Sequence, residues 1–197
     1  MLHSDIQNYS PYEGGDYVSI DFETANEKRS SACALGLAVV KDNKIVHKYS
    51  WLIRPPQMRF NYKNISIHGI EPNDVIEAPT FEDLWPVISQ YFDESMMIAH
   101  NAGFDMGVLR SCLDSYELDY PRFSYSCTLN IARNAWPFLK NHRLDSVADH
   151  LDIGFSHHDA CDDAVAAAKI ALHACDQTSS ASLEELTKYL RVSTKTF

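Results

Sequence analysis

Cysteines are few in this sequence, and they are not arranged as a disulfide framework or a zinc site requires. There are five of them, an odd number, widely spaced and without a Cys-x-x-Cys pair. This usage predicts reduced thiols in a cytoplasmic protein and argues against a disulfide scaffold or a zinc ribbon. The cysteines are Cys33, Cys112, Cys127, Cys161 and Cys175.

Long apolar runs are also missing. No stretch approaches the roughly 18 apolar residues that a membrane span needs. The first residues, 1–16, are polar and acidic and lack the apolar core of a signal peptide. We therefore expect a cytoplasmic protein that has no membrane as a partner, and we interpret segment 1–16 as a flexible leader.

Basic side chains are scarce relative to acidic ones. The 197 residues include 17 Lys and Arg against 27 Asp and Glu, which gives a formal net charge of -10. This balance argues against a protein that coats DNA or an anionic membrane by bulk electrostatics. The length fits one domain, and the apolar fraction of 45% excludes a disordered chain.

Apolar periodicity predicts an α/β protein without internal repeats. In the first half of the chain, three strands precede a helix, and a polar turn at 41–44 joins the second and third strands as a hairpin. The segment from Pro55 to Pro79 is punctuated by proline and glycine, which predicts an irregular loop. The expected strands are 17–22, 32–40 and 45–53, and the expected helix is 80–91.

The second half repeats the strand, turn and helix order that is typical of α/β folds. A strand at 96–100 leads through a short turn into a helix that begins near Gly103. Three more helices follow, the last of them apolar on most sides. A capping-box pattern at 182–185 begins a short helix in a C-terminal tail, 176–197. The three helices are expected at 127–135, 143–151 and 160–175.

Four carboxylates occupy positions where a charge needs an explanation. Asp21 and Glu23 are two residues apart at the end of the first strand, so they project from the same face. Asp105 lies in the first turn of one helix and Asp163 in the first turn of the most apolar helix. Taken singly, a solvated strand end or complementarity to a helix dipole accounts for each of them.

Taken together, the four carboxylates indicate a metal site. Strand ends and helix starts of an α/β fold converge on one edge of the sheet. An oxygen-only cluster suits Mg²⁺ or Mn²⁺ better than Zn²⁺, and two such ions can promote an in-line phosphoryl displacement by water. His158, five residues before Asp163, is a candidate to take the proton from that water, although a solvated loop histidine is the alternative.

Three motifs carry a family resemblance. Residues 21–24, 100–105 and 158–164 read DFET, HNAGFD and HDACDDA. They resemble the three motifs of the DEDDh 3'-to-5' exonucleases, the group that includes the proofreading epsilon subunit of bacterial DNA polymerase III and ribonuclease T. The resemblance covers about residues 17–175 and implies an exonuclease domain with a ribonuclease H-like α/β fold, a central mixed β-sheet flanked by helices.

The resemblance also implies a role for individual residues. Asp21, Glu23, Asp105 and Asp163 would hold two Mg²⁺ or Mn²⁺ ions as cofactors, and His158 would be the general base that leads to release of 5'-mononucleotides. By position, His157 and Asp162 are near competitors for the roles of His158 and Asp163. The substrate-binding residues expected from the motifs and from the loop at 67–70 are Thr24, Ile67, His68, Asn101 and Phe104.

The implied substrate is a nucleic acid 3' end, with DNA favoured over RNA, and the implied partner is a polymerase or repair complex. The alternatives are an exoribonuclease and a catalytically silent nucleic-acid-binding module. The net charge then predicts local action on ends, with the metal ions returning positive charge to the site. Two groups of cations and aromatic rings are candidates for binding a single strand, and ordinary solvated charge is the alternative for each. The first group is Arg54, Arg59, Phe60, Tyr62 and Lys63, and the second is Lys140, His142 and Arg143.

Overall fold

The protein is built on one six-stranded mixed sheet. The structure is a computed structural model that describes residues 14–93, 95–154 and 158–197, so most of the predicted leader lies outside the described residues. The strand order is β3-β2-β1-β4-β5-β6. β1, β4 and β5 run parallel, whereas β2 pairs antiparallel with both β1 and β3, and β6 antiparallel with β5. The strands are β1 (Tyr17–Thr24), β2 (Ala32–Lys41), β3 (Lys44–Leu52), β4 (Met96–Ala99), β5 (Ser124–Cys127) and β6 (Lys195–Thr196).

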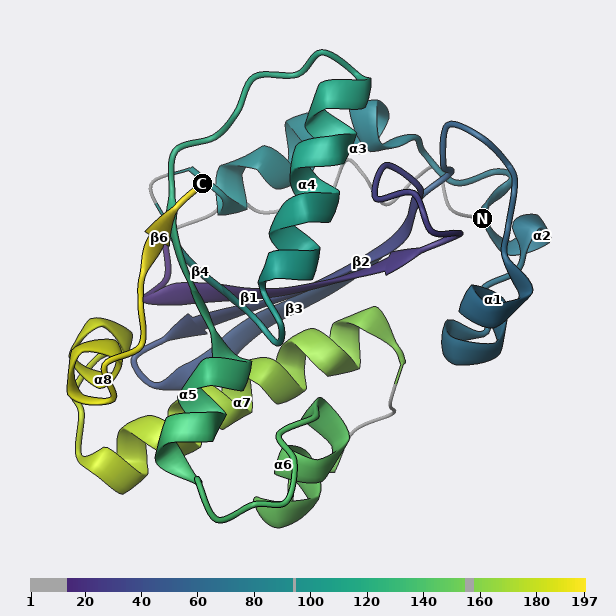
Figure 1. The fold of residues 1–197 in the computed structure, drawn as a ribbon. Coiled ribbons are helices and arrows are strands. Elements are labelled where there is room, and N and C mark those ends of the chain that lie inside the picture. The colour runs from purple at the N-terminus through teal and green to yellow at the C-terminus, as the bar shows by residue number, and fades with distance from the viewer. Residues whose placement is uncertain (1–13, 94, 155–157) are drawn as a thin grey trace.

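Helices cover both faces of this sheet. In Figure 1, α3 and α4 lie on one face and α5, α6 and α7 on the other. None of the helices in the described part of the chain is long and apolar enough to cross a membrane. The mixed sheet flanked by helices confirms the expected fold class. The helices are α1 (Tyr62–His68), α2 (Pro72–Val75), α3 (Phe81–Ile88), the 3₁₀ helix η2 (Ser89–Tyr91), α4 (Gly103–Ser115), α5 (Thr128–Ala135), α6 (Leu144–His150), α7 (Ala160–Thr178) and α8 (Leu183–Tyr189).

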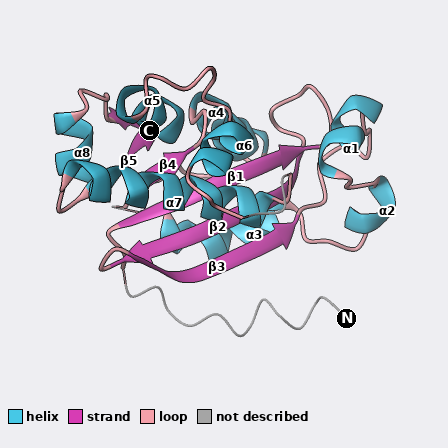
Figure 2. Ribbon diagram, turned by 90° about the horizontal axis from the view of Figure 1, so that it is seen from below, coloured by secondary structure: helices cyan, strands magenta, loops and turns pink. Residues whose placement is uncertain are grey.

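The expectation of an irregular segment between the prolines was wrong, because α1 and α2 lie there. The polar and breaking residues that suggested a loop are the helix boundaries. The Asn61 side chain accepts a hydrogen bond from the backbone N–H of Lys63 and caps α1, and Gly69 ends it with a positive φ of 73°. Pro72 is the first residue of α2, where its missing N–H costs nothing. Figure 2 shows both helices beyond the end of β1.

Two short strands were also missed. β5 contains Ser124 and Ser126 and has too little apolar alternation to stand out, yet it pairs along β4, and α5 therefore begins after Cys127. β6 is a two-residue strand against β5. Beyond it, the Phe197 ring stacks on Phe123 with 4.5 Å between ring centroids. Both strands form because they pair with neighbouring strands, and the local sequence does not reveal such pairing.

The two faces of β1 are different in kind, as its alternation predicts. Val18, Ile20 and Phe22 belong to the core beneath α3 and α4. The other face carries Ser19, which is fully buried, and then Asp21. Because residues two apart share a face, the apolar half of the strand fixes the orientation of the acidic half toward α7.

α7 packs closely across β1 and β2 because the facing residues are small. Ala34, Gly36 and Ala38 of β2 share one face of the strand, and the buried face of α7 consists largely of alanine. A Cβ at Gly36 would overlap the backbone carbonyl of Ala160 and the backbone N of Cys161. Gly36 pairs with Asp21 in the β1–β2 register, so this contact brings the first turn of α7 over the acidic end of β1.

We predict that Gly36→Ala lowers both stability and activity. The new methyl group meets backbone atoms, which cannot rotate away, and overpacking of this kind costs about 1–3 kcal/mol. The displaced helix start carries Asp163, so catalysis should fall together with the melting temperature. Gly154→Ala is the matched control, because a Cβ there would have no atom within 4 Å. A variant at position 36 that matches the wild type in thermal melting would refute the close-contact argument.

Candidate active site

The four predicted carboxylates come together at the end of β1, reached from both faces of the sheet. Asp105 in the first turn of α4 is 1% exposed, and its Oδ1 accepts a hydrogen bond of 3.1 Å from the backbone N–H of Phe22. Phe22 lies between Asp21 and Glu23 in β1. α4 is thus hydrogen-bonded to β1 at the residue between Asp21 and Glu23, whose side chains point to the opposite face of the sheet.

On the opposite face, Glu23, His158 and Asp163 form a group. One ligand atom of each side chain lies within 4.8 Å of those of the other two. Asp163 is 6% exposed, whereas its neighbour Asp162 is half-buried and donates its backbone N–H to the Asp159 side chain. Burial therefore distinguishes Asp163 from its near competitor. The other competitor, His157, lies outside the described residues.

Burial and mutual repulsion disfavour the charged forms of these groups. Burial raises the pKa of Glu23 to about 8, and the neighbouring carboxylates Asp163, Asp105 and Asp159 add to the rise. Burial likewise raises the pKa of Asp105 to about 7, although the N–H of Phe22 opposes the rise. The pKa of Asp21 is raised well above its usual range by burial first and then by Asp105, Glu23 and Asp163.

This donor set fits divalent cations. The carboxylates supply only oxygen ligands, and their shared repulsion is the condition that a bound cation relieves. Raised pKa values mark buried acids for which the protein supplies too little positive charge. A hard divalent ion would be held by Asp21, Glu23, Asp105 and Asp163, the residues expected from the sequence.

Beside this cluster, the end of β1 is tied to α1. The Thr24 backbone carbonyl accepts a hydrogen bond from the Asn64 side-chain amide at 2.8 Å and lies 3.1 Å from Nε2 of His68. Nδ1 of His68 accepts the backbone N–H of Ile70 at 3.0 Å, so Nε2 carries the proton that Thr24 accepts. Both ring nitrogens are therefore committed to backbone groups. Of the predicted substrate residues, His68 can shape the pocket with its ring, but not donate to a ligand.

A pocket of about 420 Å³ lies along this tie, and Ile67, His68, His158 and Asp159 are among the residues that line it. It places the α1 residues next to the candidate base. The remaining predicted substrate residues, Asn101 and Phe104, lie on the other side, at the β4–α4 junction. Asn101 is exposed with a φ of 72°, and Phe104 is 36% exposed.

His100 of the second motif has a structural role that the sequence did not reveal. Its Nε2 donates to the His142 carbonyl at 2.9 Å, and its Nδ1 lies 3.0 Å from Oγ1 of Thr128. Burial lowers the pKa of His100 to about 4, so the ring is neutral. The histidine ties the end of β4 to α5 and to the loop before α6, and so holds the turn that leads to Asp105.

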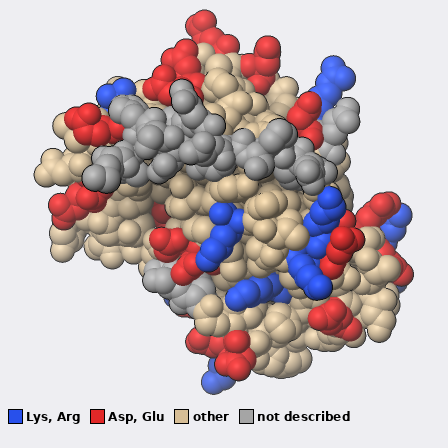
Figure 3. Space-filling view, turned by 180° about the vertical axis from the view of Figure 1, so that it is seen from behind, with Lys and Arg blue, Asp and Glu red and all other residues tan. Residues whose placement is uncertain are grey.

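The predicted cationic groups are partly committed to other residues. Arg59 donates through Nη1 and Nη2 to both carboxylate oxygens of Glu27, at 3.1 and 2.6 Å. Arg143 lies 3.2 Å from Asp145. In Figure 3, the face opposite to that of Figure 1 shows Lys and Arg gathered on one part with Asp and Glu among them. Charge of one sign does not dominate this face.

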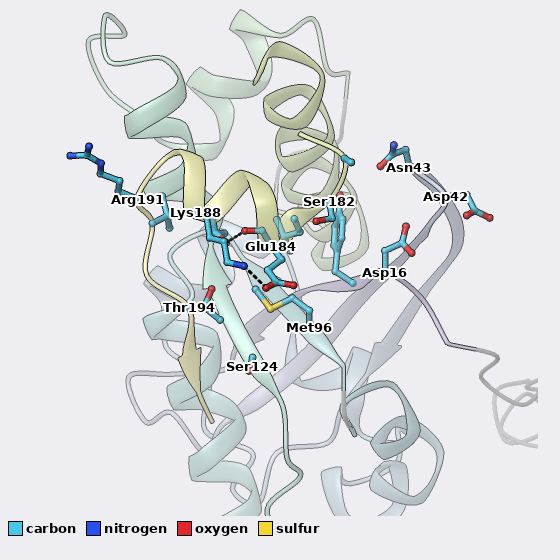
Figure 4. Close-up of a pocket in the computed structure, with 15 residues that line it drawn as sticks. Asp16, Asp42, Asn43, Met96, Ser124, Ser182, Glu184, Lys188, Arg191 and Thr194 are labelled. Carbon is cyan, nitrogen blue, oxygen red and sulfur yellow. Dashed lines mark hydrogen bonds and ion pairs between the residues drawn. The ribbon is translucent and has the colours of Figure 1, made fainter. Parts of the chain in front are cut away.

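A second cavity, of about 950 Å³, lies far from the carboxylates. It is bordered by the start of β1, the β2–β3 turn and α8. Figure 4 shows Lys188 bridging to Glu184 on one side, with Asp42 and Asn43 of the turn on the other. Its lining includes neither the carboxylate cluster nor a motif residue, so cavity size does not mark the site of chemistry here.

The mixed sheet and the carboxylate cluster at the end of its first strand define a ribonuclease H-like nuclease. The exonuclease family model RNase_T matches residues 18–171, so the chain belongs to this family, and its three motifs resemble those of the DEDDh 3'-to-5' exonucleases. Membership of this family implies a 3'-to-5' exonuclease, a hydrolase that uses divalent metal ions.

Two similar proteins are much longer than this chain. It is 33% identical over 160 residues to the PolC-type DNA polymerase III of Clostridium perfringens, which covers 79% of this chain and 11% of that protein. It is 28% identical over 183 residues to the PolC-type DNA polymerase III of Thermotoga petrophila, which covers 91% of this chain and 13% of that protein. The chain thus spans about a tenth of the length of these relatives.

Two solved structures have the same fold. Exonuclease X, in complex with 5' overhanging duplex DNA, aligns with a TM-score of 0.69 and 25% identity over 88% of this chain and 99% of that one. The nuclease domain of 3'hExo, a DEDDh family member bound to rAMP, aligns with a TM-score of 0.67 and 18% identity over 84% of this chain and 94% of that one.

The raised pKa values predict how stability depends on pH when metal is removed. Stability contributed by protonated Glu23 and Asp105 is fully present below their unfolded pKa values of about 4 and is lost as pH rises through about 8 and about 7. In EDTA, the melting temperature should therefore fall as the pH rises from about 4 to about 8, and fall less for Glu23→Gln.

Adding Mg²⁺ should remove much of this pH dependence, because a bound cation stabilises the ionised forms. Glu77→Gln, at an exposed position after α2, should behave as the wild type. Identical pH profiles for Glu23→Gln and the wild type in EDTA would contradict the crowding of Glu23.

Proposed function

We propose that this chain removes 5'-mononucleotides from the 3' ends of DNA, as single strands or recessed ends, with two divalent ions and a histidine base. The observation that carries the proposal is the group of Glu23, His158 and Asp163, together with Asp105 against the backbone of β1. It joins three carboxylates to an imidazole in one place, and the charges of Asp105, Glu23 and Asp163 also act on the nearby Asp21. A catalytically silent module could lose these carboxylates and the histidine, but all of them are present in this chain.

Asp21, Glu23, Asp105 and Asp163 hold the ions, which we propose to be Mg²⁺ or Mn²⁺. When bound, the two ions supply activation of water and stabilisation of charge on the leaving oxygen. The oxygen-only donor set favours hard cations over Zn²⁺.

His158 accepts a proton of the attacking water at an imidazole nitrogen as the water oxygen bonds to phosphorus. The bond from phosphorus to the 3' oxygen of the preceding nucleotide breaks, and that oxygen takes a proton from solvent and becomes the new 3' hydroxyl. The ring adjoins Asp163 and Glu23, close to where the phosphate must lie. Ile67 and His68 line the pocket for the terminal nucleotide, and Thr24 is hydrogen-bonded to His68 at its side. Asn101 and Phe104 flank the strand that leads to it. The backbone hydrogen bonds of His68 hold its ring in place.

DNA is the favoured substrate, and a polymerase or repair complex the favoured partner. Support comes from similarity to PolC-type DNA polymerase III and to an exonuclease whose structure contains duplex DNA with a 5' overhang. The net charge of -10 favours short-range action on an end over binding along a duplex.

The substrate is tested with matched DNA and RNA oligonucleotides that are labelled at the 5' end and offered as single strands, duplexes and duplexes with a 3' mismatch. We expect a ladder that shortens from the 3' end of DNA with Mg²⁺ or Mn²⁺ and no cleavage in EDTA. Asp21→Asn should abolish cleavage while the protein remains folded, because the ion loses a charged ligand.

Faster degradation of RNA than of DNA would overturn the choice of substrate and favour the exoribonuclease. Full activity of Asp21→Asn, or of Asp163→Asn, would overturn the assigned ligands. Binding without cleavage under all conditions would identify a silent module.

The role of His158 is tested by replacing it with Ala. Loss of a general base typically slows a reaction about 10²- to 10⁴-fold, and the wild-type rate should climb as the imidazole loses its proton, from a reference pKa of about 6.5. His173→Ala, at an exposed position of α7, is the control and should retain activity. If His158→Ala kept its rate at neutral pH, the base would lie elsewhere, with His157 the open alternative.

A further inference from the structure

Arg29 is held against the first turn of α4 by two hydrogen bonds. Its Nη1 donates to the backbone carbonyls of Gly103 at 2.8 Å and Phe104 at 3.0 Å. Its guanidinium carbon lies 5.7 Å from the centre of the Phe104 ring. Arg29 lies in the loop between β1 and β2, so it joins the end of β1 to the helix that supplies Asp105.

The helix leaves room for this side chain. A Cβ at Gly107, one turn after Gly103, would overlap the Arg29 guanidinium. Glycine in a helix interior costs about 1 kcal/mol relative to alanine. The missing methyl group is therefore unfavourable for the helix itself, but it permits the guanidinium to lie flat against it.

The fixed guanidinium still has donors for a ligand. Arg29 is exposed, and within the described part of the chain only Nη1 has acceptors. In the described residues, Nη2 and Nε of this exposed side chain have no hydrogen-bond acceptor, and its guanidinium lies beside Phe104. Arg59, one of the cations that the sequence suggested for gripping a strand, instead has both terminal nitrogens on Glu27. Arg29 thus offers a preorganised fork of the kind that binds phosphate.

We propose that Arg29 binds a backbone phosphate of the substrate strand on the 5' side of the bond that is cleaved. This inference rests on the proposed function. The 3' nucleotide occupies the pocket beside α1, so the rest of the strand leaves the carboxylates past the α4 side, where Phe104 and Arg29 lie. A base against the Phe104 ring would bring its phosphate within reach of the exposed nitrogens.

The first test is the salt dependence of kcat/KM on single-stranded DNA. Each phosphate contact contributes a slope of about -0.7 to a plot of log affinity against log salt for single strands. Arg29→Ala should make the slope shallower by about this amount and lower kcat/KM about 10-fold at low salt. Lys44→Ala, which removes a charge at the β2–β3 turn, should change neither.

The second test locates the phosphate. The substrates are a series of oligonucleotides, each with one neutral methylphosphonate at a different position. At one position, this substitution should lower the activity of the wild type but should not further lower the activity of Arg29→Ala. Gly107→Ala should reproduce this pattern without a lower melting temperature, because it displaces the guanidinium and favours the helix. Gly107→Ala also replaces Arg29→Ala in this test if Arg29→Ala does not fold.

Two results would overturn the proposal. An unchanged salt slope, or equal methylphosphonate losses in wild type and Arg29→Ala, would show that Arg29 only positions α4, even if kcat fell. The proposed function fails separately, since its failure would be seen as wild-type protein that cleaves no DNA with Mg²⁺ or Mn²⁺.

Discussion

Repulsion among four carboxylates is the constraint around which this fold is arranged. Asp21, Glu23, Asp105 and Asp163 are brought to one end of β1, where burial raises the pKa of the three groups Asp21, Glu23 and Asp105. The backbone N–H of Phe22 offsets only part of this cost. Such a cluster persists because the surrounding core holds it, and a bound cation is the natural way to relieve it.

The scaffold brings these groups together from opposite faces of the sheet. α7 reaches the acidic face of β1 because Gly36 and its alanine neighbours let it approach closely. α4 packs on the apolar face and extends Asp105 around the strand end. His100 holds the turn that begins α4, through bonds to α5 and the following loop. Small residues and a neutral histidine therefore position the site, although none of them belongs to the carboxylate cluster.

Around the carboxylates, the residues proposed to bind substrate differ in how their polar atoms are used. His68 has both nitrogens bonded to backbone and contributes shape, whereas Arg29 is anchored by one nitrogen and keeps others exposed. This division fits a chain with a net charge of -10, in which few cations are placed individually. Local placement of a cation beside the strand path serves an enzyme that works on ends better than a diffuse positive surface would.

The sequence by itself determined the fold class and proposed the carboxylates and the candidate base, because strand alternation, helical periodicity and motif spacing are local properties of the chain. It could not determine α1 and α2, whose caps look like loop residues, or β5 and β6, which exist only through pairing with neighbours. Burial separated Asp163 from Asp162, because adjacent side chains on a helix point in different directions and only the packing of the helix shows which one is buried. Gly36, His100 and Arg29 acquired their roles from contacts with residues more than 20 positions away, and only the tertiary structure decides such contacts.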